Sequence, residues 1–236
     1  MSPVRHRIEV VSTRALSPHL RRITFNGPEL ELSAQQVAPA LKLFVPHEQG
    51  TVVRPYTVRA ADIGTGRFNI DFALCADGPA SNWAEAAKPG AVIECAAPHS
   101  GFDYQPDIDW YLLIGDASAL PAIAAIVEAM PAGVPVLAMI ETPTALDRLA
   151  LDSDAFLLAQ WFSREQRWLG PDLCLEEVIG ALAPRRGRGR AWIAGEVERV
   201  RFLRGVVSSA LHLDPADITA SGYWKYGVAA QDDEIC

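Results

Sequence analysis

Arg54 and Tyr56 are separated by one residue in the segment Arg54-Pro55-Tyr56-Thr57, and such a pair could bind a ligand that carries both a phosphate and a flat ring. Proline biases the residue before it toward an extended conformation, and alternate residues of a strand point to the same side, so both side chains should share one face. Arginine can bind phosphate oxygens through two donors, tyrosine can stack on an aromatic ring, and Thr57 can hydrogen-bond a ring heteroatom. The alternative is an ordinary strand with a solvated arginine and a packed tyrosine.

A second candidate phosphate site is predicted where a strand passes through a glycine turn into a helix. Small residues at the start of that helix would let a phosphate approach unpaired backbone N–H groups at the positive end of the helix dipole. Ser81 could add a hydroxyl donor, while the alternative is an ordinary capped helix with Trp83 in the core. The candidate cofactor-binding residues of this segment are Asp71, Phe72, Ala73 and Leu74 of the strand, then Gly78, Pro79, Ala80, Ser81 and Trp83.

Two further segments, Gly115-Asp116 and Gly195-Glu196, end predicted strands with glycine and an acidic residue. Open parallel sheets bind ligands at the carboxyl ends of their strands, so both segments are candidates for holding a dinucleotide. The first lacks the GxGxxG spacing, and both could be ordinary strand ends. An aromatic tail near the C-terminus could either cover a flat cofactor or form a surface hook. The remaining candidates are Ser118 and Ala119 after the first glycine, and Tyr223 and Trp224 in the tail.

The elements that must position these residues fall into two groups. Up to about residue 100, short β-rich runs separated by turns predict a small antiparallel barrel or sandwich with one helix at residues 79–88. Later, apolar strands alternate with helical segments, as in a parallel α/β sheet. We therefore expect an N-terminal antiparallel β-barrel domain at residues 1–106 and a C-terminal α/β domain at residues 107–236. The expected strands are residues 6–15, 20–26, 41–45, 56–59, 67–75, 91–96, 111–114, 134–140, 156–161 and 191–194, and the later helices are residues 120–130, 144–151, 171–182 and 196–211.

The composition of the chain argues against several classes of partner. Its 21 basic and 29 acidic side chains give a net charge of −8, so no overall positive field would attract nucleic acid or an anionic membrane. Residues 1–107 carry 10 basic and 11 acidic side chains, whereas residues 108–236 carry 11 and 18, so the excess lies in the second half. The four cysteines form no metal-binding or disulfide pattern, and neither a signal peptide nor a membrane span is evident, so a cytoplasmic location is expected.

Together these segments, in this order and spacing, resemble the siderophore-interacting protein family, flavin-dependent ferric-siderophore reductases related to ferredoxin reductases. The resemblance covers nearly the whole chain. It implies an oxidoreductase of iron homeostasis that passes electrons from NADH or NADPH through FAD to a ferric siderophore or other ferric chelate and releases Fe(II). Its most specific parts are residues 54–57, matching Arg-x-Tyr-Ser/Thr, Gly78-Pro79-Ala80-Ser81 with Trp83-Ala84, Gly115-Asp116 with residues 119–122, Ala194-Gly195-Glu196, and Ser221-Gly222-Tyr223-Trp224.

The resemblance also implies a role for each candidate. Arg54 would contact the flavin phosphate or ribityl region, Tyr56 would stack on the isoalloxazine, and Thr57 would bond near its reactive edge. Residues 71–74 would border the flavin through their backbone, and residues 80–81 would hold the pyrophosphate. No catalytic side chain is expected, because the flavin itself converts a two-electron hydride into single electrons for iron. The residues framing the nicotinamide dinucleotide would be Gly115, Asp116, Gly195 and Glu196, with Tyr223 and Trp224 near the flavin face.

Two departures from the family pattern bear on these expectations. Cys75-Ala76-Asp77 stands where relatives commonly have a histidine, so the contact expected from that histidine is in doubt. With Lys42, Lys88 and Lys225 as the only lysines, arginines would have to line any siderophore platform. A dense run of basic residues follows the end of a predicted helix. Its side chains either form a solvated face or attract an anionic chelate or the 2′-phosphate of NADPH. That run consists of Arg185, Arg186, Arg188 and Arg190.

Two other functions remain open at this stage. A related flavin reductase could pass electrons to another acceptor, and a non-catalytic protein could bind a siderophore or a flavin. The strand ends at Gly115 and Gly195 disfavour the latter, because a pure binding module needs no second dinucleotide site. The type of siderophore, the choice between NADH and NADPH and the oligomeric state stay open, with a monomer as the simplest expectation.

Overall fold

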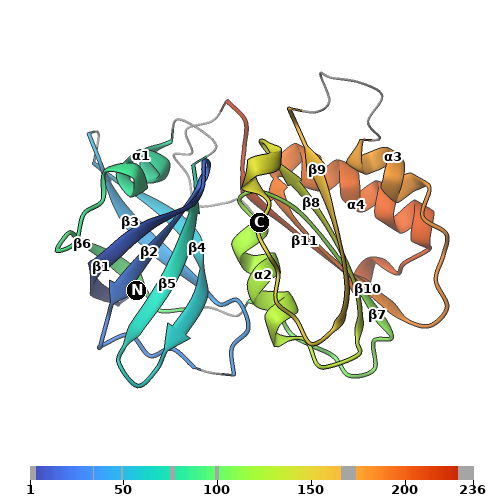
Figure 1. The fold of residues 1–236 in the computed structure, drawn as a ribbon, viewed down its shortest axis with the longest axis horizontal. Coiled ribbons are helices and arrows are strands. Elements are labelled where there is room, and N and C mark those ends of the chain that lie inside the picture. Colours follow the sequence, from blue (N-terminus) through green and yellow to red (C-terminus); the bar gives the residue numbers. More distant parts are fainter. Residues whose placement is uncertain are drawn as a thin grey trace. The chain divides into compact units, whose positions relative to one another are not determined.

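A computed structural model of the chain describes residues 4–33, 35–48, 50–74, 78–98, 101–165 and 174–227. The chain divides into two compact units, the first built mainly from the residues before Tyr104 and the second from those that follow (Figure 1). Among the described residues, no helix combines the length and the apolar character that crossing a bilayer would require. No group of three or more described His, Cys, Asp or Glu residues is arranged to hold a metal ion.

The first unit is a closed antiparallel barrel with strand order β1-β2-β5-β4-β3-β6. Its interior is filled by alternate side chains of each strand, as Phe68, Ile70 and Phe72 show in β5. One helix, α1 (Pro79–Ala86), buries Ala80 and Ala84 against this core. The strands are β1 (Arg5–Ser17), β2 (Leu20–Asn26), β3 (Ala40–His47), β4 (Gly50–Asp62), β5 (Arg67–Ala73) and β6 (Val92–Ala96).

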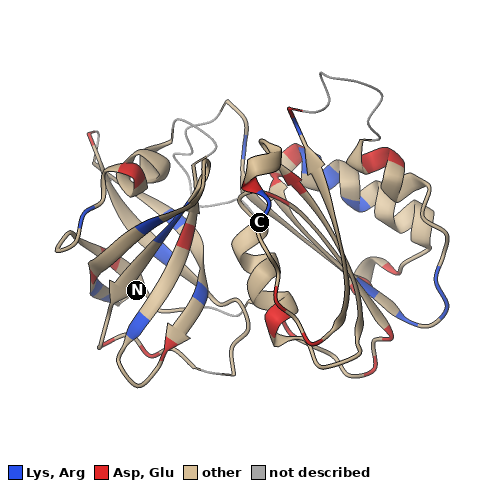
Figure 2. Ribbon diagram, in the orientation of Figure 1, with Lys and Arg blue, Asp and Glu red and all other residues tan. Residues whose placement is uncertain are grey.

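The second unit is a parallel sheet with strand order β11-β10-β7-β8-β9, and every residue of its central strand β7 is buried. Figure 1 shows α2 on one face of the sheet and α3 and α4 on the other. The only charged residue of α2 is Glu128 (Figure 2), as expected of a helix that is almost entirely buried. The elements are β7 (Trp110–Asp116), α2 (Leu120–Ala129), β8 (Pro135–Thr142), β9 (Phe156–Ser163), α3 (Leu175–Gly180), β10 (Gly189–Glu196), α4 (Val197–Leu211) and β11 (Ile218–Trp224).

The fold class expected from the sequence, an antiparallel barrel followed by a parallel α/β sheet, is confirmed, but two local expectations are wrong. The helix expected at residues 144–151 is only a 3-10 turn, Ala145–Asp147. Leu146 in this turn is 75% exposed, so a helix there would have had no surface on which to bury an apolar stripe. The aromatic tail, for which no strand was expected, forms β11 at the edge of the sheet. Part of the helix expected at residues 171–182 lies outside the described residues.

Candidate functional site

The barrel opens between β4 and β5 at the two segments that the sequence singled out. In the described residues these strands pair only where Val58 to Asp62 meets Arg67 to Ile70. Residues 54–57 pair with β3 alone, and residues 71–73 pair with β2 alone. Pro55, which has no N–H group, is tolerated in the middle of β4 because one side of the strand has no partner there. At this end of the two strands the described residues of β4 and β5 are therefore not bonded to each other, and a ligand could bond to their facing edges.

Tyr56 lies at this opening with its ring against the barrel core. Its ring centroid is 4.4 Å from that of Phe72, at an interplanar angle of 40°. Burial raises the pKa of the Tyr56 phenol far above its ordinary value, and the nearby Arg54 guanidinium offsets this only in part, so the ring stays neutral at any physiological pH. Arg54 donates from Nη1 to the carbonyl oxygen of Val53 at 2.6 Å. The structure thus brings a cation and a flat ring together, with Thr57 buried beside them.

The helix α1 begins beside the end of β5 and has an uncapped N-terminus. Gly78 is its N-cap residue, and no side chain of the described residues accepts a hydrogen bond from its first backbone N–H groups. Ser81 donates its hydroxyl to the carbonyl oxygen of Ala73 at 3.2 Å, which ties the first turn to β5. Free N–H groups at the positive end of a helix are well suited to a phosphate. The residues before this helix, including Cys75, lie outside the described residues.

Two other candidates of the barrel have structural partners. Both carboxylate oxygens of Asp71 accept from the Arg22 guanidinium, at 2.6 and 2.7 Å, and the Asp71 residue is only 3% exposed. This buried pair joins β2 to β5, so only the backbone of Asp71 is available to a ligand. Trp83 stacks on Phe25, with ring centroids 6.3 Å apart and an interplanar angle of 8°, and belongs to the packing of α1 on the barrel.

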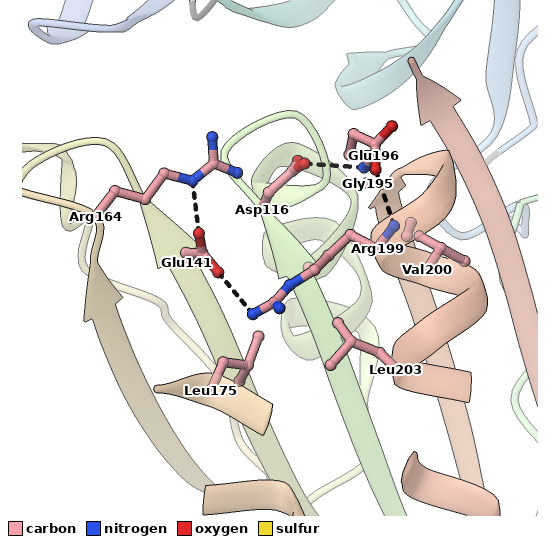
Figure 3. A pocket seen from close by; sticks show the side chains of 11 residues that line it. Asp116, Glu141, Arg164, Leu175, Gly195, Glu196, Arg199, Val200 and Leu203 are labelled. Atoms are coloured by element: carbon pink, nitrogen blue, oxygen red, sulfur yellow. Dashed lines mark hydrogen bonds and ion pairs between the residues drawn. The ribbon is translucent and has the colours of Figure 1, made fainter. Parts of the chain in front are cut away.

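In the second unit a pocket lies at the carboxyl ends of β7, β8 and β10, beside the start of α4 (Figure 3). Gly115 and Gly195 both line it. A Cβ atom on Gly115 would lie 2.5 Å from the Cβ of Ala119, and one on Gly195 would lie 2.7 Å from an oxygen of Asp116. Gly195 also has a φ of +146°, which side chains rarely permit. Both glycines are therefore required by close packing at the strand ends.

Four charged side chains that sequence reasoning missed form a chain of ion pairs, and three of them, Glu141, Arg164 and Arg199, line this pocket (Figure 3). Arg164 Nε and Arg199 Nη2 lie 2.5 and 3.4 Å from the two oxygens of the buried Glu141. Arg199 also binds Glu176 at 2.5 Å, and this hydrogen bond lowers the pKa of Glu176 to about 2. These residues come from β8, α3, α4 and the position after β9, and the only sequence signal was that Glu141 and Arg164 fall at or just after the ends of strands.

The N-terminus of α4 is capped from within the protein. The Glu196 carboxylate accepts a hydrogen bond from the backbone N–H of Arg199 at 2.8 Å. It thereby occupies the position that a phosphate would need, with the charge that a phosphate would bring. Glu196 lines the pocket, but it does so as a helix cap.

The remaining candidates of the second unit gather around Asp116. Its carboxylate accepts from the Ser118 backbone and hydroxyl, from the Glu196 backbone and from Trp224 Nε1. Ala119 packs as the fully buried N-cap residue of α2. Tyr223 meets Trp192 edge to face, with ring centroids 6.4 Å apart.

In the dense arginine run, Arg185 and Arg188 make contacts within the protein. Arg188 binds Asp107 and Asp217, which joins the start of β10 to the segments before β7 and β11. The Arg185 guanidinium lies over the ring of Trp110, 5.8 Å from its centroid. These contacts explain the positions of Arg185 and Arg188, and no ligand is needed to explain them.

Comparison with known proteins relates each of the two units to a protein family. Residues 108–227 match the family model described as siderophore-interacting protein, and residues 40–102 match the siderophore-interacting FAD-binding domain. The mycobactin import ATP-binding/permease protein IrtA of Mycolicibacterium smegmatis is 30% identical over 95% of this chain, which spans only 26% of IrtA. The ferric vibriobactin reductase ViuB of Vibrio cholerae is 26% identical, over 93% of this chain and 89% of ViuB. A siderophore utilization protein from T. fusca has a TM-score of 0.85 at 27% identity, covering 98% of this chain and 97% of that one.

Proposed function

This chain belongs to the siderophore-interacting protein family, which confirms the resemblance drawn from its motifs, and on that premise we propose that it is an FAD-dependent ferric-siderophore reductase. It would take electrons from NADH or NADPH and deliver them to an Fe(III) chelate. The observation that carries the proposal is the opening of the barrel in the unit that matches an FAD-binding domain. The name of the relative ViuB, a ferric vibriobactin reductase, supports the same reaction.

The residues around the barrel opening fit FAD. Tyr56 offers a neutral aromatic face, and the uncapped first turn of α1 offers N–H donors for the pyrophosphate. Among the described strands, the backbone of residues 55–57 and 71–72 has no ladder partner on the side where β4 and β5 separate, so it can bond the edge of a flat heterocycle. When bound, FAD supplies the conversion between two-electron and one-electron transfer, which no side chain of this protein could perform.

The pocket of the second unit fits the nicotinamide donor. Parallel sheets of this strand order bind dinucleotides at the carboxyl ends of their strands. Arg164 uses Nε for Glu141, and its terminal nitrogens point away from that carboxylate (Figure 3). They provide positive charge for a donor phosphate at an edge that is otherwise rich in carboxylates. Either NADH or NADPH satisfies this arrangement.

The iron chelate is the substrate in this proposal. Siderophore oxygens are hard ligands that hold Fe(III) more tightly than Fe(II), so reduction releases the metal without hydrolysis of the chelator. The chain's net charge of −8 repels an anionic chelate at long range, so productive binding must depend on local arginines. We place the reaction in the cytoplasm, where the reductant is available and where a buried free thiol such as that of Cys95 stays reduced.

Anaerobic stopped-flow spectroscopy tests the proposal. The purified protein should be yellow, its flavin absorbance should bleach with NADH or NADPH, and a ferric siderophore should restore the colour while a ferrous-specific chelator captures Fe(II). Colourless protein that takes up no added FAD would contradict the reductase. Bleaching that other acceptors reverse and ferric siderophores do not would favour a related flavin reductase. Flavin or siderophore binding without reduction by either nicotinamide would favour a binding protein.

A further inference from the structure

Asp116, at the carboxyl end of β7, has its entire hydrogen-bonding capacity occupied by the protein. One oxygen accepts from the Ser118 backbone at 2.8 Å and the Ser118 hydroxyl at 2.5 Å. The other accepts from the Glu196 backbone at 3.1 Å and from Trp224 Nε1 at 2.8 Å. A carboxylate has about four lone-pair positions, so these four donors fill it. Asp116 is also only 9% exposed.

A buried carboxylate so occupied is unsuited to binding a dinucleotide. It carries a negative charge, which would repel a pyrophosphate, and it has no acceptor position left for a ribose hydroxyl. Its partners instead come from the start of α2, the start of α4 and the end of β11, three elements that meet at the strand ends. Asp116 therefore holds other parts of the protein in place rather than binding a dinucleotide.

The end of β11 is shaped to deliver Trp224 to Asp116. The register of β10 and β11 shifts here, because Gly195 pairs with Gly222 while Glu196 pairs with Trp224, which leaves Tyr223 as an extra residue. Such a bulge re-aims the side chains that follow it. Gly195 contributes from the other side, since a Cβ atom at this residue would lie 2.7 Å from the Asp116 oxygen that binds Trp224.

We infer that Asp116 is a positioning residue that fixes the orientation of the Trp224 indole, and that it influences the nicotinamide step only through that ring. The part that concerns nicotinamide rests on the proposed function and on the role that the family resemblance implies for Trp224. The part that concerns the indole does not. A charge-assisted hydrogen bond to Nε1 removes the rotational freedom of the ring, so a planar ligand meets a surface that is already ordered.

A double-mutant cycle tests this inference, with the rate constant of flavin reduction at subsaturating NADPH and NADH as the readout. Asp116→Asn exchanges one acceptor for a donor, and Trp224→Phe keeps a ring but removes Nε1. Each should slow reduction about tenfold, the factor that corresponds to one charge-assisted hydrogen bond. In the Trp224→Phe background, Asp116→Asn should have no further effect. If the slowing caused by the two substitutions multiplied in the double variant, Asp116 would contact the donor directly, and the inference would be overturned.

The indole N–H signal of Trp224 provides a readout that does not depend on activity. In the ¹H–¹⁵N spectrum of the holoprotein, this signal, assigned by its loss in Trp224→Phe, should lie downfield and exchange slowly with solvent. Asp116→Asn should move it upfield and speed its exchange. An unchanged signal would overturn the positioning role. If neither nicotinamide reduces the flavin, the proposed function fails, while the indole signal still decides the role of Asp116.

Asp147→Asn serves as the matched control. Asp147 is another buried carboxylate of the same unit, and it accepts from the Thr144 backbone at 3.0 Å and the Thr144 hydroxyl at 2.8 Å, as Asp116 does from Ser118. Its replacement should lower the melting temperature while leaving both the Trp224 signal and flavin reduction unchanged. If Asp147→Asn slows reduction as much as Asp116→Asn does, the effect of Asp116 is only a loss of stability.

Discussion

A helix N-terminus can stay open to an anion or be capped by a carboxylate, and the barrel unit and the sheet unit of this protein differ in this respect. In the barrel unit, α1 has Gly78 as its N-cap residue and no side-chain cap from the residues that the structure describes. In the sheet unit, α4 begins at Glu196, whose own carboxylate caps it. Both helices follow a strand through glycine, so the strand-glycine-helix pattern alone does not identify a phosphate site. The cap residue decides, because a carboxylate and a phosphate compete for the same N–H groups and the same dipole.

The largest effect is expected when the α1 start is made to resemble that of α4. Gly78 has φ −113° and ψ 153°, an extended conformation that any residue adopts, so Gly78→Asp should fold normally and cap the helix. The apoprotein should melt at a higher temperature, while FAD should bind about a hundredfold more weakly, the size of one or two lost charge-assisted hydrogen bonds. Titration with FAD and thermal melts measure both. Gly78→Ala is the uncharged control, and equal weakening there would refute competition by the carboxylate.

Removal of the aromatic face in the barrel unit should have the next largest effect. Tyr56→Ala should weaken FAD binding about tenfold, because a stacking surface is lost. The apoprotein should lose less melting temperature than the holoprotein, since Tyr56 lies at the rim of the barrel core rather than within it. Tyr56→Phe, which keeps the ring, is the control and should retain most of the flavin. Equal losses of melting temperature with and without FAD would contradict this role.

The reverse change in the sheet unit should affect stability and leave flavin binding unchanged. Glu196→Gln weakens the cap of α4 and should lower the free energy of unfolding by about 1 kcal/mol. The flavin content should stay at the wild-type level. Chemical denaturation and the absorbance ratio of flavin to protein measure the two quantities. Loss of flavin from this variant would mean that the two helix starts do not have the separate roles described above.

The smallest effect is a pH dependence confined to the sheet unit. Arg199 lowers the pKa of Glu176 from its ordinary 4.5 to about 2, so the pair stabilises the folded state above pH 4.5 and this contribution is lost as the pH falls toward 2. Glu176→Gln should therefore flatten the decline of stability between these pH values. Denaturation curves of both proteins across this range would reveal it. Parallel declines would show that the pair contributes nothing to acid stability.

The local signals in the sequence were sufficient for the two-part architecture and for the segments at the barrel opening. Arg54 and Tyr56 are two residues apart, and that spacing alone predicted that they would lie together. The chain of ion pairs among Glu141, Arg164, Arg199 and Glu176 could not be predicted, because its members come from four elements whose approach depends on tertiary packing. The strand β11 was missed because an edge strand lacks the continuous apolar run that marks a buried one.

In the described residues the facing edges of β4 and β5 separate at one end, and this separation bears on the abundance of the protein in the cell. A cofactor that bonds to those edges completes hydrogen bonding that the polypeptide leaves unfinished, so it acts as part of the folded structure as well as a reagent. Any ligand that binds only the native state raises its stability by mass action. The abundance of this protein should therefore follow the supply of flavin, because chains that have not acquired FAD unfold more often and are degraded first.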